Sequence, residues 1–285
     1  MTCTTLEHAL AADKSDLRVQ LWDGYGWTGR NAGESSTPLH ALGLIVTSDG
    51  WTLGKAEPAT TLTTIPGVAG SIDQTEEDPA LHAYPGRRTV EINIAALGDP
   101  GQVQEGMANA GALHGALVRI QGLLPDPFLA LEGRASLGEW TLNRRVDGRL
   151  VAAVGTLSID AMPYAHGQTE RVSLAAGTNN VTLKGNAPIQ PFVSLDSPSG
   201  STAPASLTYY GTKRTQVLKS YRNSGVGWSF WCADRYSKAR AKGGDTTDPK
   251  IGLALSADWM ELPPGAIQLT CSTTGYLEYE PGYLF

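Results

Sequence analysis

Cysteine is scarce in this sequence, and its few residues are scattered. The three cysteines in 285 residues are Cys3, Cys232 and Cys271, and no two have the spacing of a metal-binding or redox motif. An odd number of cysteines in a long chain is typical of reduced thiols made in a cytosol. We therefore expect Cys232 and Cys271, which lie in apolar strand-like runs, to pack as small hydrophobic side chains.

Long apolar runs and excess positive charge are also missing. No window approaches the roughly 18 apolar residues of a membrane-spanning helix. The opening MTCTTLEHALAADKSD lacks the basic and apolar regions of a signal peptide. Because the formal net charge is −6, a nucleic acid partner is not favoured. We interpret Arg87–Arg88 and Arg144–Arg145 as solvent-facing strand charges rather than as a basic patch.

Motifs of catalysis and cofactor binding are absent as well. The sequence has no nucleophile elbow, zinc-protease helix, phosphate loop or dinucleotide fingerprint. None of its five histidines has metal-ligand spacing. The acidic run with Asp73, Glu76, Glu77 and Asp78 leaves a calcium or paired-carboxylate site open as an alternative, but such loop runs are normally solvated. We expect no enzyme, catalytic residue, cofactor or metal.

Glycine and proline, in contrast, are plentiful. The 33 glycines and 17 prolines interrupt the sequence at short intervals, as short strands and turns require. This predicts a mainly β protein of two domains, residues 1–165 and 166–285. The second domain carries only strand signals, which indicate a β-sandwich. Its last ten residues are rich in tyrosine, and we expect them to pack on this domain or on the first.

The first domain is predicted to be a β-barrel or sandwich with one helix. It begins with a polar leader, residues 1–16. Further along the chain, strict alternation of apolar and polar residues through Val90, Ile92 and Ile94 marks a half-buried strand. A helix over about residues 100–117 should begin at the N-cap Asp99, with His114 packed on its apolar stripe. The pair Asp147–Gly148 is a strong hairpin signal.

An extended arm is predicted over residues 59–86. Its segment TIPGVAG has two glycines, but no helix follows, so it is not a phosphate-binding loop. Apolar residues at Leu62, Ile65, Val68 and Ile72 argue against disorder. The arm should therefore lie on a surface.

Three aromatic residues lie close together in GWSFWCAD. Alternation places Trp228 and Phe230 on one face of a strand and Trp231 on the other. Core packing is the favoured interpretation. A sugar-stacking role for Trp228 and Trp231 remains the alternative.

In their order along the chain, these features resemble the distal tail proteins of siphophages. The resemblance rests on ALGLIVTSDGW, TIPGVAGSIDQT, YPGRRTVEINI, the helical GDPGQVQEGMANAGALHGALVRI and SIDAMPY. It covers residues 37–165 well. The remainder matches by architecture only, since members of this size continue into a galectin-like β-sandwich, for which GNAPIQPFVSL to LPPGAIQL has the expected layout.

The resemblance implies a structural virion protein, made in the host cytoplasm and located at the phage tail tip. It would be a hub that links tail tube to baseplate, in a homo-hexameric ring through which DNA passes as cargo. Its partners would be the proteins of the tail tube and tail tip and the receptor-binding proteins, and it would not bind a membrane. The arm would form a belt on the next subunit, with Ile65, Pro66, Gly67, Val68 and Ile72 at the interface.

Alternatives of three kinds stay open. The arm could fold over its own sheet as an Ω-like loop. The whole chain could instead be a carbohydrate-binding adhesin that recognises host-surface glycans. A carboxylate glycosidase ranks below both.

Overall fold

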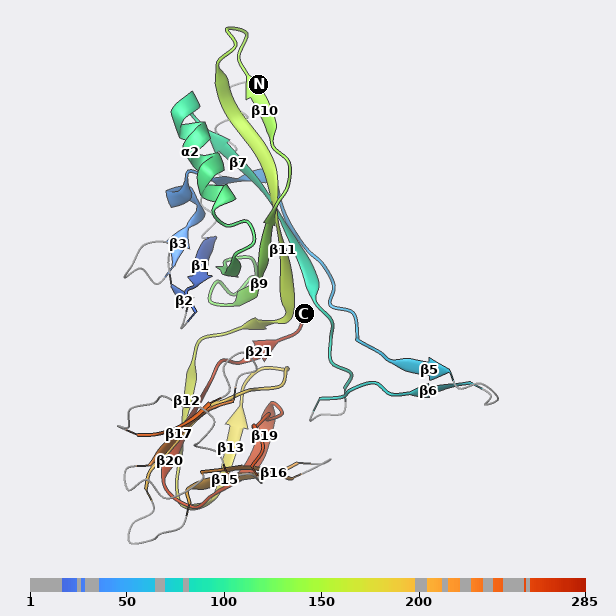
Figure 1. The fold of residues 1–285 in the computed structure, drawn as a ribbon, viewed down its shortest axis with the longest axis vertical. Coiled ribbons are helices and arrows are strands. Elements are labelled where there is room, and N and C mark those ends of the chain that lie inside the picture. The colour runs from blue at the N-terminus through green and yellow to red at the C-terminus, as the bar shows by residue number, and fades with distance from the viewer. Residues whose placement is uncertain are drawn as a thin grey trace. The chain divides into compact units, whose positions relative to one another are not determined.

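In the computed structural model, one long strand, β11 (Leu150–His166), organises the first part of the chain. Figure 1 shows it beside β7 (Arg88–Leu97), with which it pairs antiparallel over ten positions, from Ala152↔Leu97 to Ala161↔Arg88. The buried positions of β7 alternate through Val90, Ile92 and Ile94. The alternation expected at these three residues is therefore confirmed, because one face of β7 lies in the core.

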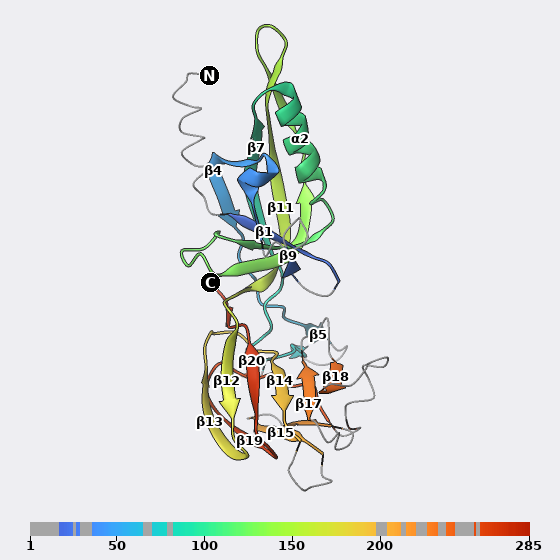
Figure 2. The same ribbon diagram turned by 90° about the vertical axis from the view of Figure 1, so that its left-hand side faces the viewer.

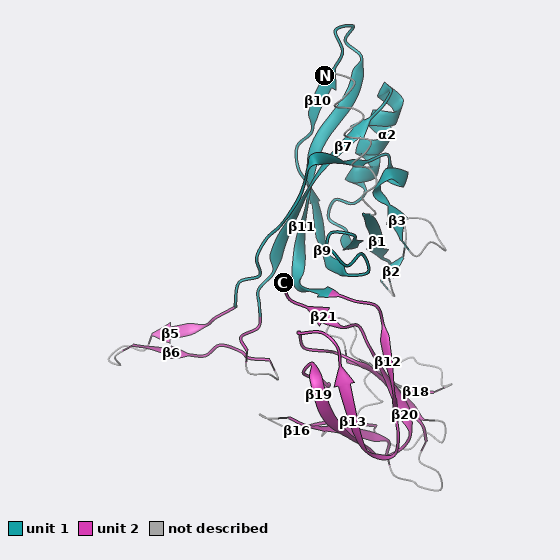
Figure 3. Cartoon of the chain, turned by 180° about the vertical axis from the view of Figure 1, so that it is seen from behind, with its two compact units in different colours: residues 1–58, 85–165, 285 teal, residues 59–84, 166–284 magenta. Residues whose placement is uncertain are grey.

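The structure describes residues 17–24, 27–28, 36–64, 70–78, 82–197, 204–211, 215–220, 227–232, 238–242, 254 and 257–285. The contacts within the chain divide it into two compact units (Figure 3). Unit 1 comprises residues 1–58, 85–165 and 285, and unit 2 comprises residues 59–84 and 166–284. The arm residues thus group with the second unit, whereas the sequence assigned them to the first. No helix among the described residues is long and apolar enough to cross a bilayer.

Unit 1 is built on one antiparallel sheet. The sheet follows the order β2-β1-β8-β9-β11-β7-β4, with β3 on β1 and β10 on β11. Its remaining strands are β1 (Arg18–Trp22), β2 (Trp27–Thr28), β3 (Thr37–Pro38), β4 (Ile45–Leu53), β8 (Leu117–Gln121), β9 (Ala130–Leu137) and β10 (Thr141–Arg144). A short 3-10 helix, η1 (Leu39–Leu42), precedes β4. A mainly β fold is confirmed, but over the described residues the sheet is open rather than a closed barrel.

One α-helix, α2 (Pro100–Gly111), covers part of this sheet. It begins as expected, since the Asp99 carboxylate accepts from the Gln102 N–H at 2.9 Å and the Asp99 N–H donates to Gln102 Oε1 at 3.0 Å. The predicted end near residue 117 is wrong. Gly115 has a φ of 78°, and its N–H donates to the Ala135 carbonyl, so the chain leaves the helix and returns to the sheet.

The placement of His114 also differs from the expectation. It lies beyond the end of α2 and is exposed, so it does not belong to the apolar stripe of the helix. Its Nδ1 accepts a hydrogen bond from the Leu137 N–H at 3.0 Å. The imidazole therefore ties the turn after α2 to the end of β9.

Unit 2 is a sandwich of two antiparallel sheets. One sheet, seen in Figure 2, has the order β12-β20-β14-β17-β18, and the other has the order β13-β19-β15-β16. The first contains β12 (Glu170–Leu174), β20 (Gly275–Tyr279), β14 (Phe192–Leu195), β17 (Trp228–Trp231) and β18 (Lys238–Ala241). The second contains β13 (Gly177–Leu183), β19 (Gly265–Cys271), β15 (Ser206–Tyr210) and β16 (Thr215–Lys219). The arm adds a ribbon of β5 (Leu62–Thr64) and β6 (Ser71–Asp73).

The core between the two sheets is apolar and includes both described cysteines. Its most deeply buried large side chains include Leu183, Ile189 and Phe230. Cys232 and Cys271 belong to this core as free thiols, and burial raises the pKa of each to about 12. The expectation that they pack as small hydrophobic side chains is confirmed.

The end of the chain is held at several points. The Asn186 side chain accepts from the Leu284 N–H at 2.7 Å and donates to the Leu284 carbonyl at 3.0 Å. The short strand β21 (Gly282–Tyr283) lies just before it. The carbonyl oxygen of Phe285 accepts from Nη2 of Arg88, and both residues belong to unit 1. Arg88 is buried, so its interpretation as a solvent-facing strand charge is wrong.

Candidate interaction surfaces

The acidic residues of the arm serve its turns. Asp73 Oδ1 accepts from the Thr75 N–H at 2.9 Å, and its hydrogen bonds to Thr75 lower the Asp73 pKa. Asp78, which is buried, accepts from the His82 N–H at 3.0 Å. Across the described ranges, no three metal-ligating side chains come together. The turn geometry accounts for Asp73 and Asp78 without a ligand.

The arm ribbon exposes apolar side chains on both of its faces. In its register, Leu62 pairs with Asp73, and Thr63 pairs with Ile72. Leu62 and Ile72 therefore point to opposite faces, and they are 64% and 43% exposed. An isolated two-stranded ribbon is marginally stable in water. The other predicted interface residues, Ile65 to Val68, lie outside the described residues.

The root of the arm is fastened to the sandwich within unit 2. The Tyr84 hydroxyl donates to Glu261 Oε2 at 2.6 Å, and the Glu261 N–H donates to Oε1 of the buried Gln216 at 2.8 Å. The Ala59 N–H donates to the Tyr84 carbonyl at 2.8 Å. Both ends of the arm thus meet at Tyr84, and a hydrogen bond to a carboxylate holds that residue.

The edge strands β10 and β4 of unit 1 lie at opposite ends of one row of paired residues that crosses four neighbouring strands. Thr141 of β10 pairs with Val154, Val154 with Ala95 of β7, and Ala95 with Ile45 of β4. Over the described part of the sheet, β10 pairs with β11 alone and β4 with β7 alone. The row therefore ends at each side in backbone groups that can pair with another strand.

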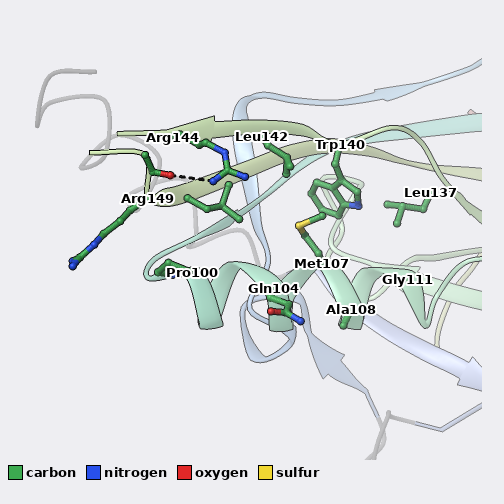
Figure 4. Close-up of a pocket in the computed structure, with 12 residues that line it drawn as sticks. Pro100, Gln104, Met107, Ala108, Gly111, Leu137, Trp140, Leu142, Arg144 and Arg149 are labelled. Atoms are coloured by element: carbon green, nitrogen blue, oxygen red, sulfur yellow. Dashed lines mark hydrogen bonds between the residues drawn. The ribbon is translucent and has the colours of Figure 1, made fainter. Parts of the chain in front are cut away.

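A groove of about 800 Å³ separates α2 from the β10–β11 hairpin (Figure 4). Its helix side is formed by Pro100, Gln104, Met107, Ala108 and Gly111. Its other side is formed by Leu137 at the end of β9, by Trp140 before β10, and by the hairpin residues Leu142, Arg144, Gly148, Arg149 and Leu150. Figure 4 shows the Met107 sulfur beside the Trp140 ring. The guanidinium of Arg144 donates to the Gly148 carbonyl at 3.0 Å. The groove thus has an apolar floor and a basic rim.

The sandwich carries an aromatic platform, formed by Phe192, Trp231 and Tyr276, on the outer face of its five-stranded sheet. The ring centroids of Phe192 and Trp231 are 4.8 Å apart, and those of Phe192 and Tyr276 are 5.9 Å apart. The Arg171 guanidinium lies over the Tyr276 ring at 3.5 Å. Arg171 Nε is 3.6 Å from Glu278 Oε1. The three strands β14, β17 and β20 supply one ring each.

The structure separates the two tryptophans for which a sugar-stacking role was considered. Trp228 is 5% exposed and belongs to the core with Phe230, so it offers no ring face to a ligand. Trp231 points outward and is half-buried. The predicted alternation along this strand is therefore correct. Phe192 and Tyr276 were missed because they are distant in sequence, and only the pairing of β14 with β17 and β20 brings them to Trp231.

The fold has relatives among solved structures. No family model and no curated protein matches the chain. The Dit protein of phage SPP1, described as a paradigm of the hub of the adsorption apparatus in phages that infect Gram-positive bacteria, matches with a TM-score of 0.54. The match has 16% identity over 83% of this chain and 95% of that one. This chain therefore has the fold of that Dit protein.

Two structures of the phage P2 baseplate in its activated conformation also match, each at 8% identity. The structure with calcium has a TM-score of 0.49 and covers 93% of this chain and 97% of that one. The structure with strontium has a TM-score of 0.48, with 92% and 97% covered.

Proposed function

We propose that this chain is a structural protein of a phage tail, the distal hub between the tail tube and the tip, and not an enzyme. The observation that carries the proposal is the fold shared with the SPP1 Dit protein over most of both chains. On this proposal the protein is made in the host cytoplasm and resides in the virion. Its work is to hold neighbours in place, which needs shaped surfaces rather than reactive groups.

The hub would be a closed ring of six copies. Two open edges at opposite ends of one pairing row, β4 and β10, support a head-to-tail contact in which β10 of one copy pairs with β4 of the next. A repeated head-to-tail contact closes into a ring when its rotation fits. DNA would pass through the hole as cargo.

The arm would be a belt on the neighbouring copy. Leu62 and Ile72 project from opposite faces of the ribbon, so a neighbour that encloses the ribbon would remove both from water. Burying exposed apolar area contributes roughly 25 cal/mol per Å². We place Ile65, Pro66, Gly67 and Val68 at the same contact.

The remaining surfaces would serve the other tail components. The groove between α2 and the β10–β11 hairpin suits an apolar segment with a carboxylate, and tube or tail-tip proteins are the proposed occupants. The sandwich, for which the resemblance implies a galectin-like fold, would carry receptor-binding proteins during adsorption.

Light scattering of the purified protein at several concentrations tests the ring. We expect a discrete mass near six or twelve times 30.1 kDa. Deleting residues 61–80, or replacing both Leu62 and Ile72 by serine, should lower that mass, because both changes remove the apolar contact of the belt. Replacing the exposed Phe128 of unit 1 by serine is the matched control and should leave it unchanged. An unchanged mass after the deletion would contradict the belt.

Labelling tests the hub itself. Gold-labelled antibody against the chain should mark the distal end of the tail on particles of the virus that encodes it. Label on the capsid, or on no part of the particle, would overturn the proposal, whatever mass the isolated protein has.

A further inference from the structure

We infer that the aromatic platform of unit 2 is a carbohydrate-binding site, with Trp231 as its stacking residue. This inference does not depend on the hub proposal, because it rests on one face of one sheet. Neighbouring positions place the rings together: Trp231 pairs with Phe192, and Tyr276 lies diagonally across on β20. Three rings on three adjacent strands form a shallow surface.

The size of the platform favours a small ligand. Aromatic side chains bury roughly 150–250 Å² each when fully covered. Each of these three residues is half-buried, so together they offer only a fraction of the roughly 450–750 Å² that three fully covered aromatic side chains would bury. A stable protein interface needs about 800 Å² per partner. The platform is therefore much smaller than a protein-docking surface and comparable with one or two sugar rings.

The chemistry of the rings and their border favours a sugar. One face of a pyranose presents C–H groups, whose partial positive charge is attracted to the negative face of an aromatic ring. The hydroxyls around the sugar edge need both donors and acceptors. Arg171 and Glu278 border the rings as a guanidinium and a carboxylate, and they provide both.

The geometry of Arg171 strengthens this assignment. Its guanidinium is held over the Tyr276 ring at 3.5 Å, while its side chain remains 58% exposed. Among the described residues, no hydrogen bond engages its two terminal nitrogens. A planar donor fixed beside a stacking surface can bind two neighbouring hydroxyls with little loss of conformational freedom. A nucleobase would also stack there, but the net charge of −6 disfavours its phosphates.

The test uses the full-length protein and a printed array of pyranose mono- and oligosaccharides, including amino sugars and deoxy sugars. The strongest array ligand is then titrated against the protein by tryptophan fluorescence and calorimetry. We expect Trp231→Ala to weaken binding by about tenfold or more, as for a residue at the centre of a contact. Trp231→Phe should retain most of the affinity, and Arg171→Ala should lose several-fold.

The matched control is Tyr210→Ala. Tyr210 is an exposed aromatic residue of the same sandwich, on the opposite sheet, and its removal should leave the affinity unchanged. Thermal unfolding confirms that each variant is folded. Equal loss in the Trp231 and Tyr210 variants, or no saccharide bound by the folded protein at millimolar concentration, would overturn the assignment.

Light scattering separates the sugar site from a contact between copies. The mass of the assembly should be the same for the wild type and Trp231→Ala. If that variant loses mass and no sugar binds, the platform is an interface between copies and the carbohydrate assignment is wrong.

Discussion

At the scale of single residues, two glycines explain how a glycine-rich helix is tolerated. Gly106 of α2 faces Gly43, the residue after η1, which has a φ of 71°. A Cβ on Gly106 would lie 2.7 Å from the Gly43 carbonyl oxygen and 2.8 Å from the Ala96 Cβ. The helix therefore packs backbone to backbone, and the lower helix propensity of Gly106 is the cost of that approach.

Gly106→Ala should destabilise the protein. Overpacking in a tight contact costs roughly 1–3 kcal/mol. Because the added Cβ would lie closer than 3 Å to both the Gly43 carbonyl oxygen and the Ala96 Cβ, this cost exceeds the roughly 1 kcal/mol by which alanine favours the helix. Gly111→Ala is the control in the same helix, since nothing lies within 4 Å of its added Cβ. Its unfolding free energy should rise by up to about 1 kcal/mol. Denaturant titration measures both, and equal effects of the two variants would contradict the close approach.

Residue patterns in the sequence predicted local structure well and distant contacts poorly. Asp99 was predicted as the N-cap of α2 from its place before Pro100, and the structure adds the reciprocal bond from Gln102, three positions further on. The end of α2 was missed although Gly111 and Gly115 are local stop signals. The contacts of Gly115 and His114 with β9, which fix the turn after the helix, are not visible in the local sequence. The aromatic platform was missed for the same reason, since its rings come from three strands.

At the scale of elements, the arm combines a free ribbon with a fixed root. Its ribbon strands are exposed throughout, so they show no hydrophobic periodicity, and the sequence predicts only an extended segment there. Periodicity predicts strands only where one face is buried in the same chain. The root, by comparison, is held by Tyr84 on Glu261.

Removing the Tyr84 hydroxyl should loosen the root without unfolding the sandwich. A hydrogen bond to a charged group contributes about 1.5–3 kcal/mol, so Tyr84→Phe should speed hydrogen exchange at the Ala59 amide, which donates to the Tyr84 carbonyl. Tyr210→Phe, at an exposed tyrosine, should have no effect. If the Ala59 amide exchanges at the wild-type rate in Tyr84→Phe, the hydroxyl contact does not hold the root.

At the scale of the whole molecule, two compact units each contain a core of their own. Units that fold separately melt separately. We therefore expect two transitions in calorimetry. Gly106→Ala, a change within unit 1, should move only one of them, by roughly 2–8 °C per kcal/mol. A single transition, or equal shifts of both, would show instead that the chain unfolds as one cooperative body.

The arm between Pro58 and Pro85 is a segment whose length can change without disturbing unit 1. Pro58 and Pro85 face each other in an isolated bridge, and the Gly86 N–H donates to the Glu57 carbonyl at 2.6 Å. The chain thus departs from unit 1 and returns to it at the same place. Adding or removing residues between these two points costs little loop-closure entropy and leaves the pairing of β4 with β7 intact. The arm is therefore a suitable insertion site, where a longer arm or a foreign peptide could be introduced without changing the register between β4 and β7.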